Sequence, residues 1–202
     1  MKFKIENLFP IPVQFSSLKR KFTKQELIFI KSQENKIYLN QGNSTSNNHD
    51  ILEHKLLKNL KKEIISLINI YAKEVLNYEN VEFYITQSWL NYTKKSEYHH
   101  THAHPNSIIS GVLYINTYEE DKIYFYKNGY NQISPKIKNY NIYNSSSWWF
   151  PVKNGDIILF PSSTTHGVNR KEQDNVRISL AFNTFIKGSL GRDEELTKLV
   201  II

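Results

Sequence analysis

The chain has 202 residues, of which 40% are hydrophobic and 22% are charged, and this length predicts a single compact domain over residues 1–202. It contains no cysteine, which excludes disulfide bonds, Cys-ligated metal sites and thiol nucleophiles. The net charge is +7, but the cations are mostly lysines spread beside acidic residues, so we expect a solvated surface and no nucleic-acid partner.

The N-terminal part is predicted to lead into the domain. Residues 1–16 alternate apolar and polar side chains around Pro10 and Pro12, which suits an edge or lead-in strand because proline cannot donate to a β-ladder. Thr23 is a candidate N-cap for a short helix, and residues 39–48 are predicted to be a loop because Gly, Ser and Asn cluster there. No apolar run approaches the roughly 18 residues that would span a bilayer. We therefore expect a cytoplasmic protein without a membrane partner.

A longer helix is predicted next. Asp50 and Glu53 form a candidate capping box. Apolar residues then recur at steps of three and four, at Leu57, Leu60, Ile64, Ile68, Tyr71 and Val75. Because the segments that follow are predicted to be strands, we expect this helix to cover one face of a sheet. Residues 1–80 would thus comprise the lead-in strand and supporting helices.

From residue 81 the apolar period changes to two. One strand face is predicted to carry Val81, Phe83 and Ile85 and to continue with Gln87, Trp89 and Asn91. A strand that runs from a packed core into a polar pocket would show this change of character. An edge strand that emerges into solvent would show it too, and the sequence leaves both interpretations open.

Further strands are predicted at residues 108–116, 123–126, 156–160 and 176–185, separated by turn signals. Strand follows strand without intervening helices, which favours an antiparallel sandwich or barrel over residues 81–190. A polar loop is predicted at residues 134–148. The predicted fold class is mainly β with N-terminal helices.

Histidines are concentrated in the segment YHHTHAHP, where His99, His100, His102 and His104 fall within six positions. Residues two apart project to the same side of an extended segment, so His102 and His104 are one candidate ligand pair and His100 and His102 are another. Imidazole suits zinc, iron, copper or nickel. A chance run of histidines on a solvated loop is the alternative.

Two later residues strengthen the metal hypothesis. His166 comes just past a predicted buried strand, and Arg177 begins another strand on which Ser179, Ala181 and Asn183 share its face. A buried guanidinium must be paired with an anion, and its planar fork matches a carboxylate. Ser179 would add a hydroxyl donor. An internal Asp or Glu is the alternative partner of the guanidinium.

The chain thus contains, in order, the H-x-H pair, the segment SGVLY (110–114), the segment GDIILFP (155–161) followed by His166, and the segment RISLAFN (177–183). This succession resembles the 2-oxoglutarate and Fe(II)-dependent oxygenases. More narrowly, it is similar to a bacterial and phage subgroup that is distantly similar to prolyl 4-hydroxylases. The resemblance runs through most of the chain.

The resemblance implies a double-stranded β-helix, a jelly roll of eight core strands, in which an H-x-D/E pair and a distal histidine hold Fe(II). In this sequence His102 and His104 occupy the H-x-D/E positions, and His166 is the distal histidine. One departure is that His104 replaces the usual carboxylate, so a ferrous ion would keep two positive charges instead of one. A rival arrangement would take a carboxylate from Glu97.

The resemblance also implies where 2-oxoglutarate binds. Arg177 would bind its distal carboxylate, with Ser179 beside it, and Tyr114 is a further candidate contact. Dioxygen is the second co-substrate, and ascorbate would be a supporting reductant. The implied reaction is hydroxylation of an unactivated carbon, with release of succinate and CO₂, in the cytoplasm of a bacterium or a phage-infected host.

The substrate implied by analogy is a small molecule or peptide: a prolyl residue or a small amino-acid-like compound. Candidate pocket residues are Gln87, Trp89, Asn91 and Asn183. Trp148, Trp149 and the tyrosine-rich loop 118–143 are either a lid or packing residues. The alternative from another functional class is a non-catalytic metal-binding jelly roll in which the strand arginine only bridges a structural carboxylate.

Overall fold

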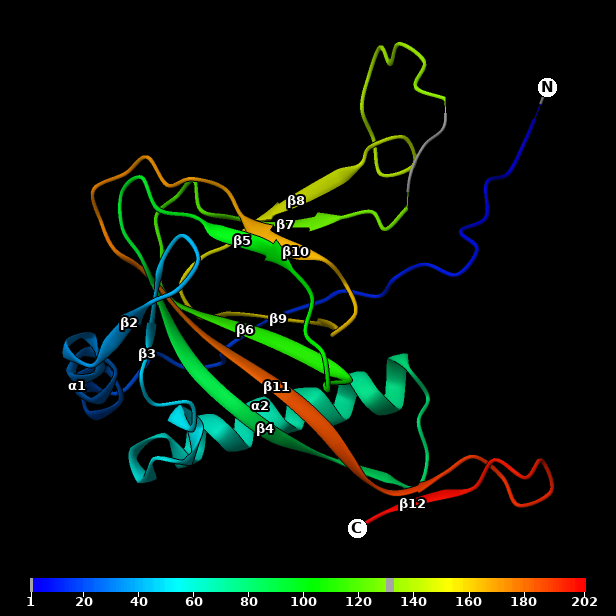
Figure 1. The fold of residues 1–202 in the computed structure, drawn as a ribbon, viewed down its shortest axis with the longest axis horizontal. Helices are drawn as coiled ribbons and strands as arrows, with labels where there is room; N and C mark the ends of the chain where they lie inside the picture. Colours follow the sequence, from blue (N-terminus) through cyan, green and yellow to red (C-terminus); the bar gives the residue numbers. More distant parts are fainter. Residues whose placement is uncertain (1, 130–132) are drawn as a thin grey trace.

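The computed structural model describes residues 2–129 and 133–202, and its strands form two facing antiparallel sheets (Figure 1). Within these residues the larger sheet has the strand order β1-β9-β6-β11-β4-β3-β2, and β12 pairs with the end of β11. Its strands are β1 (Gln14–Ser17), β2 (Ile37–Leu39), β3 (Ser44–Ser46), β4 (Val81–Thr93), β6 (Ile109–Asn116), β9 (Asp156–Pro161), β11 (Arg177–Leu190) and β12 (Leu199–Ile201). The smaller sheet has the order β5-β10-β7-β8, with β5 (His99–His102), β7 (Lys122–Tyr126), β8 (Ser147–Pro151) and β10 (His166–Val168).

The helices precede the main strands in the chain. They are α1 (Lys24–Ser32) and α2 (Lys58–Ile70), and the π-helical turn Tyr71–Val75 continues α2. Short 3-10 turns lie at Gln33–Asn35, Ile51–Glu53 and Lys55–Leu57. None of the helices in the described residues is long and apolar enough to cross a membrane.

The larger sheet is buried on both faces. On one face, Leu60 and Ile64 of α2 pack with Leu113 of β6 in the main hydrophobic core. On the other face, Tyr114 of β6 packs with Phe125 of the smaller sheet in a second core. This arrangement confirms the predicted fold class, a mainly β protein whose N-terminal helices buttress a jelly-roll core.

The start of the chain differs from the prediction. The predicted strand over residues 1–16 is wrong for residues 2–13, which have no regular structure, and β1 begins only at Gln14. The predicted loop over residues 39–48 is also wrong in part, because β2 and β3 form a hairpin there. Ser44 and Thr45 pair with β4, and the small side chains of β3 are buried. Tertiary pairing therefore overrides the local loop composition.

The predicted capping box at Asp50 and Glu53 is wrong. The segment Ile51–Glu53 is a 3-10 turn without a side-chain cap, and α2 begins only at Lys58. The predicted apolar stripe is confirmed from Leu57 to Tyr71, whose members are buried in the main core, but it is wrong for Val75, which is 48% exposed.

The predicted cap at Thr23 is confirmed. Its hydroxyl accepts from the backbone N–H of Glu26 at 3.2 Å, and the Glu26 carboxylate accepts from the Thr23 N–H at 2.7 Å. The same carboxylate is buried and bound by Arg20 through two hydrogen bonds of 2.7 and 2.8 Å. The cap thus anchors α1 and the chain before it.

We expect Thr23→Ala to destabilise the fold by about 1 kcal/mol, because the cap hydroxyl satisfies a backbone donor that α1 leaves free. Urea unfolding followed by circular dichroism measures the change. Ser146→Ala, which removes an exposed hydroxyl, is the control and should leave the midpoint unchanged. Equal midpoints for the two variants would contradict this account of the cap.

The four strands predicted after residue 81 are confirmed as β6, β7, β9 and β11, with β11 extended to Leu190. The predicted loop 134–148 is wrong at its end, where β8 begins at Ser147 and pairs with β7. The aromatic pair Trp148 and Trp149 therefore belongs to a strand.

A bulge in β4 corrects the predicted strand face. Gln87 lies opposite Asn183 of β11, while Ile85 lies opposite the very next residue, Thr184. Thr86 is therefore an extra residue in β4, and an extra residue shifts the alternation of side chains between the two faces.

The bulge moves the polar end of β4 to the inner face of the sheet. Phe83 and Leu90 both belong to the core on the α2 side, although one is odd-numbered and the other even-numbered. Gln87 and Trp89 instead line a cavity on the opposite face. The prediction of one continuous face was wrong, while the interpretation of a strand that runs from a core into a polar pocket is confirmed.

Candidate functional site

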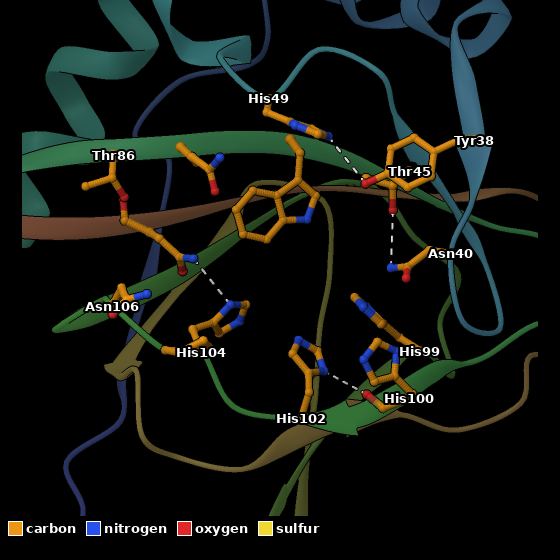
Figure 2. Close-up of a pocket in the computed structure, with 14 residues that line it drawn as sticks. Tyr38, Asn40, Thr45, His49, Thr86, His99, His100, His102, His104 and Asn106 are labelled. Atoms are coloured by element: carbon orange, nitrogen blue, oxygen red, sulfur yellow. Dashed lines mark hydrogen bonds between the residues drawn. The ribbon is translucent and has the colours of Figure 1, made fainter.

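A cavity of about 590 Å³ opens beside the smaller sheet (Figure 2). One wall is a row of imidazoles from β5 and the residues after it: His99, His100, His102 and His104. The opposite wall includes Tyr38 and Asn40 of the β2–β3 hairpin, with Thr45 and His49 following them. A cluster of titratable nitrogen ligands thus faces a polar wall.

The tip of the hairpin contacts the histidine strand at two points. The backbone N–H of Tyr98 donates to the carbonyl oxygen of Gly42 at 2.9 Å. The His100 Nδ1 donates to the carbonyl oxygen of Gln41 at 3.3 Å. Gly42 has φ +93°, and a Cβ there would lie 2.7 Å from the Tyr98 carbonyl oxygen, so this close approach requires glycine.

Three of the predicted site residues converge at the end of the cavity. His102 ends β5 and lies directly opposite His166, the first residue of β10. His104 follows two residues after His102, and its Nε2 lies 3.4 Å from the Nε2 of His166. Each of the three offers one nitrogen, and these nitrogens all lie within 4.8 Å of one another. A single ion would reach all three rings.

Backbone hydrogen bonds fix the tautomers of two of these rings. The His102 Nδ1 lies 2.8 Å from the carbonyl oxygen of His100, and the His166 Nδ1 lies 3.0 Å from that of Thr164. Because a carbonyl can only accept, both Nδ1 atoms carry the proton. The lone pairs are therefore on Nε2, as in metal-binding histidines whose other nitrogen donates to a backbone oxygen.

Burial keeps the three rings neutral. Desolvation is the largest cause that lowers the pKa of all three, to about 4 for His104 and about 3 for His166, with the neighbouring histidines adding to it. A neutral imidazole binds a metal without first losing a proton. The donor set consequently fits a divalent transition ion.

Glu97, the predicted rival ligand, does not join the three histidines. The Glu97 carboxylate accepts from the backbone N–H of Lys94 at 2.8 Å, and it is not among the described groups of converging ligands. His100, the predicted alternative to His102 as a ligand, belongs to a second group with His99 and His102. His102 is common to both groups.

Arg177 begins β11 and is almost fully buried, with 4% of its surface exposed. Its Nη1 lies 3.9 Å from the Asp121 carboxylate and 3.5 Å from the Lys122 carbonyl oxygen, so neither contact is a short hydrogen bond. Its Nε is buried without a hydrogen-bond partner among the described residues. One donor of the guanidinium is therefore buried and unsatisfied, and the contacts of Nη1 are long, which favours a further anionic partner.

The neighbours of Arg177 face the same interior. Ser179 lies opposite Tyr114 of β6, and both side chains are buried between the sheets. The Tyr114 ring centroid lies 5.8 Å from the Arg177 Cζ. Burial raises the pKa of Tyr114 to about 12, so its hydroxyl remains a proton donor at neutral pH.

Residues 87–183 match the model of the family described as putative 2OG-Fe(II) oxygenase. This region of the chain therefore resembles the 2-oxoglutarate and Fe(II)-dependent oxygenases. The predicted class of enzyme and its cofactors, Fe(II) and 2-oxoglutarate, are confirmed at the level of the family.

Several solved structures share the fold of this chain. A 2OG-Fe(II) oxygenase family oxidoreductase from Burkholderia pseudomallei has a TM-score of 0.57 and 14% identity, over 84% of this chain and 83% of that chain. HygX from Streptomyces hygroscopicus, with nickel, 2-oxoglutarate and hygromycin B bound, has a TM-score of 0.55 and 13% identity over 84% and 82%. A Pseudomonas putida prolyl-4-hydroxylase has a TM-score of 0.52 and 10% identity over 86% and 92%. No curated protein matches the sequence.

The predicted pocket residues of the oxygenase divide into two groups. Gln87, Trp89 and Asn183 line the cavity. Asn91 does not: it is buried and accepts a 3.0 Å hydrogen bond from Thr45. Asn183 also approaches the His104 ring, at 3.4 Å from its Nδ1.

The two alternatives for the aromatic segment, a lid or packing residues, both stay predictions. Trp148 and Trp149 are partly exposed on β8 and do not line the cavity, and Lys122 Nζ lies 4.1 Å above the Trp149 ring. Part of the tyrosine-rich loop, residues 130–132, lies outside the described residues. The cavity also contains Tyr38, Asn40 and Thr45, which the sequence does not single out; the last two lie in the predicted loop 39–48.

Proposed function

We propose that this protein is an Fe(II)- and 2-oxoglutarate-dependent dioxygenase that hydroxylates an unactivated carbon. Per turnover, the substrate, O₂ and 2-oxoglutarate give the hydroxylated substrate, succinate and CO₂. The observation that carries the proposal is the convergence of His102, His104 and His166 in the same interior as a buried Arg177, whose Nε has no hydrogen-bond partner among the described residues. Neither half of this arrangement alone would indicate the reaction.

The three histidines would hold the ferrous ion. Three protein ligands leave room on the metal for 2-oxoglutarate and dioxygen, and the bound ion supplies the oxidising chemistry. The chain's own contribution is positioning, because the backbone bonds of His102 and His166 orient their rings before any ion arrives. No side chain is needed as a general acid or base.

The co-substrate would extend from the metal site toward Arg177. The guanidinium would bind the distal carboxylate of 2-oxoglutarate through two parallel hydrogen bonds. Ser179, on the same strand as Arg177, and Tyr114, on the neighbouring strand β6, would contact the same carboxylate, and their burial supports this role. Asp121 is the internal rival, but its 3.9 Å separation leaves the fork available.

The open end of the cavity would bind the substrate. Gln87, Trp89 and Asn183 line it next to His104, and the Trp89 ring centroid lies 5.9 Å from that of His104. These polar and aromatic side chains suit a prolyl residue or a small amino-acid-like molecule. The fold is shared with a prolyl-4-hydroxylase and with a protein that has hygromycin B bound, and fold alone does not select between such substrates.

An anaerobic titration tests the proposal. Adding 2-oxoglutarate to the Fe(II)-loaded protein should produce a weak visible charge-transfer band, because chelation by the keto acid puts it in electronic contact with the iron. At about 100 times its Kd, 2-oxoglutarate should also stabilise the fold by about 2.7 kcal/mol, read as a higher Tm. Metal binding with neither effect would identify the alternative, a non-catalytic metal-binding jelly roll.

A further inference from the structure

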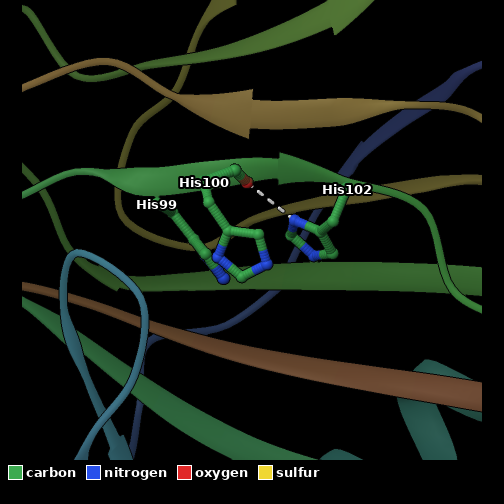
Figure 3. Close-up of side chains that lie close together, drawn as sticks. All are labelled: His99, His100 and His102. Carbon is green, nitrogen blue, oxygen red and sulfur yellow. Dashed lines mark hydrogen bonds between the residues drawn. The ribbon is translucent and has the colours of Figure 1, made fainter.

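Two imidazoles of the cavity wall, His99 and His100, have no part in the proposed reaction. Their ring centroids lie 4.7 Å and 4.6 Å from that of His102, and 5.3 Å from each other. Each of the three rings offers a nitrogen, and these nitrogens lie within 4.8 Å of one another (Figure 3). This group is as compact as the one that contains His104 and His166.

A bulge in β5 brings the three rings to one side. His102 pairs with His166 and His99 pairs with Val168, so three steps along β5 match two steps along β10. In a regular strand His99 would point away from His100 and His102, and the extra residue removes that alternation.

Gly167 of β10 accommodates the bulge. A Cβ at this position would lie 3.1 Å from the carbonyl oxygen of His99 and 3.3 Å from that of His100. The glycine therefore lets the two backbones approach closely, which holds the irregular strand in place.

The chemistry of this second group suits a borderline transition ion. It contains only imidazoles, whose neutral nitrogens suit zinc, nickel and copper as well as iron. All three side chains are partly exposed and line the cavity, so an ion can reach them from solvent.

We propose that His99, His100 and His102 form a second site for a divalent zinc, nickel or copper ion, and that an ion there excludes one at the oxygenase site. The His102 Nδ1 donates to the His100 carbonyl, so only its Nε2 can bind a metal. Two divalent ions sharing this small wall would also repel each other. The exclusion rests on the ligand set of the proposed function, whereas the second site itself does not.

Zinc binding to the metal-free protein tests the inference. The wild type, His100→Ala and His166→Ala should each bind one zinc ion per chain, because each retains one complete group of three imidazoles. The double variant His100→Ala/His166→Ala should bind zinc more weakly by about 100-fold or more, since even outer-shell changes cost roughly 10–100-fold. His49→Ala, from the opposite wall, is the matched control and should bind as the wild type does.

The outcomes separate the two claims. If His166→Ala binds zinc as weakly as the double variant while His100→Ala is unaffected, the second site is overturned and the oxygenase site stands. If instead only His100→Ala binds as weakly as the double variant, the second site is supported and the proposed iron ligands are wrong. Two zinc ions bound at once to the wild type would overturn the exclusion. Two controls detect a loss of zinc binding that is caused by misfolding. One is the more conservative substitution His100→Gln, and the other is thermal unfolding of each metal-free variant.

Discussion

Arg177→Ala is expected to weaken 2-oxoglutarate binding roughly 30- to 3,000-fold, since truncating one partner of a buried, hydrogen-bonded charge pair costs about 2–5 kcal/mol. Iron binding should change far less, because Arg177 is not a member of the imidazole group. Anaerobic titration of the Fe(II)-loaded variant with 2-oxoglutarate, followed by the charge-transfer band, measures the co-substrate. A separate Fe(II) titration measures the metal.

Two further variants of this arginine site sharpen the result. Arg177→Lys keeps the charge but loses the planar fork, so its affinity for 2-oxoglutarate should fall between those of the wild type and the alanine variant. Arg170→Ala removes an exposed guanidinium and is the matched control. Unchanged 2-oxoglutarate affinity in Arg177→Ala would mean that this arginine serves only Asp121.

His166→Ala is expected to abolish the Fe(II)–2-oxoglutarate band and to reduce succinate formation by about 100-fold or more. The variant leaves two imidazoles of the proposed iron site, and losing even an outer-shell partner of a metal site costs roughly 10–100-fold. Stopped assays of succinate from labelled 2-oxoglutarate measure turnover. The charge-transfer band is the decisive measurement, because metal binding alone does not report on the iron site: an ion can still bind to His99, His100 and His102 in this variant.

The matched control is His49→Ala, which removes an imidazole of the same cavity outside both ligand groups. It should keep the band and the basal conversion of 2-oxoglutarate. A normal band in His166→Ala would contradict the assignment of His166 as an iron ligand.

Much of this site could be predicted from sequence because its parts follow simple periodic rules. His102, His166 and Arg177 each stand at the end or start of a strand, where a residue's place in the pattern indicates its direction, and His104 follows two residues after β5. The resemblance to a known family then assigned the roles, and the structure brings the three histidines together.

What could not be predicted depends on pairing between distant segments. The bulge at Thr86 is visible only when β4 is aligned with β11, and the bulge in β5 only when it is aligned with β10. Both change which side chains face the cavity, and no single-strand pattern records them. The β2–β3 hairpin could not be predicted for the same reason, because the polar residues of β3 form a strand only by pairing with β4.

Two hydrogen bonds join the tip of the β2–β3 hairpin to Tyr98 and His100 beside the cavity. The acceptors are the backbone carbonyl oxygens of Gly42 and Gln41. These two contacts therefore do not depend on the side chains of the hairpin tip, although position 42 must be glycine. A larger residue at position 42 would clash with Tyr98 and displace β5, the strand that carries His102. The position of β5, and with it the geometry of the imidazole groups, therefore depends on two carbonyl contacts made by the hairpin tip.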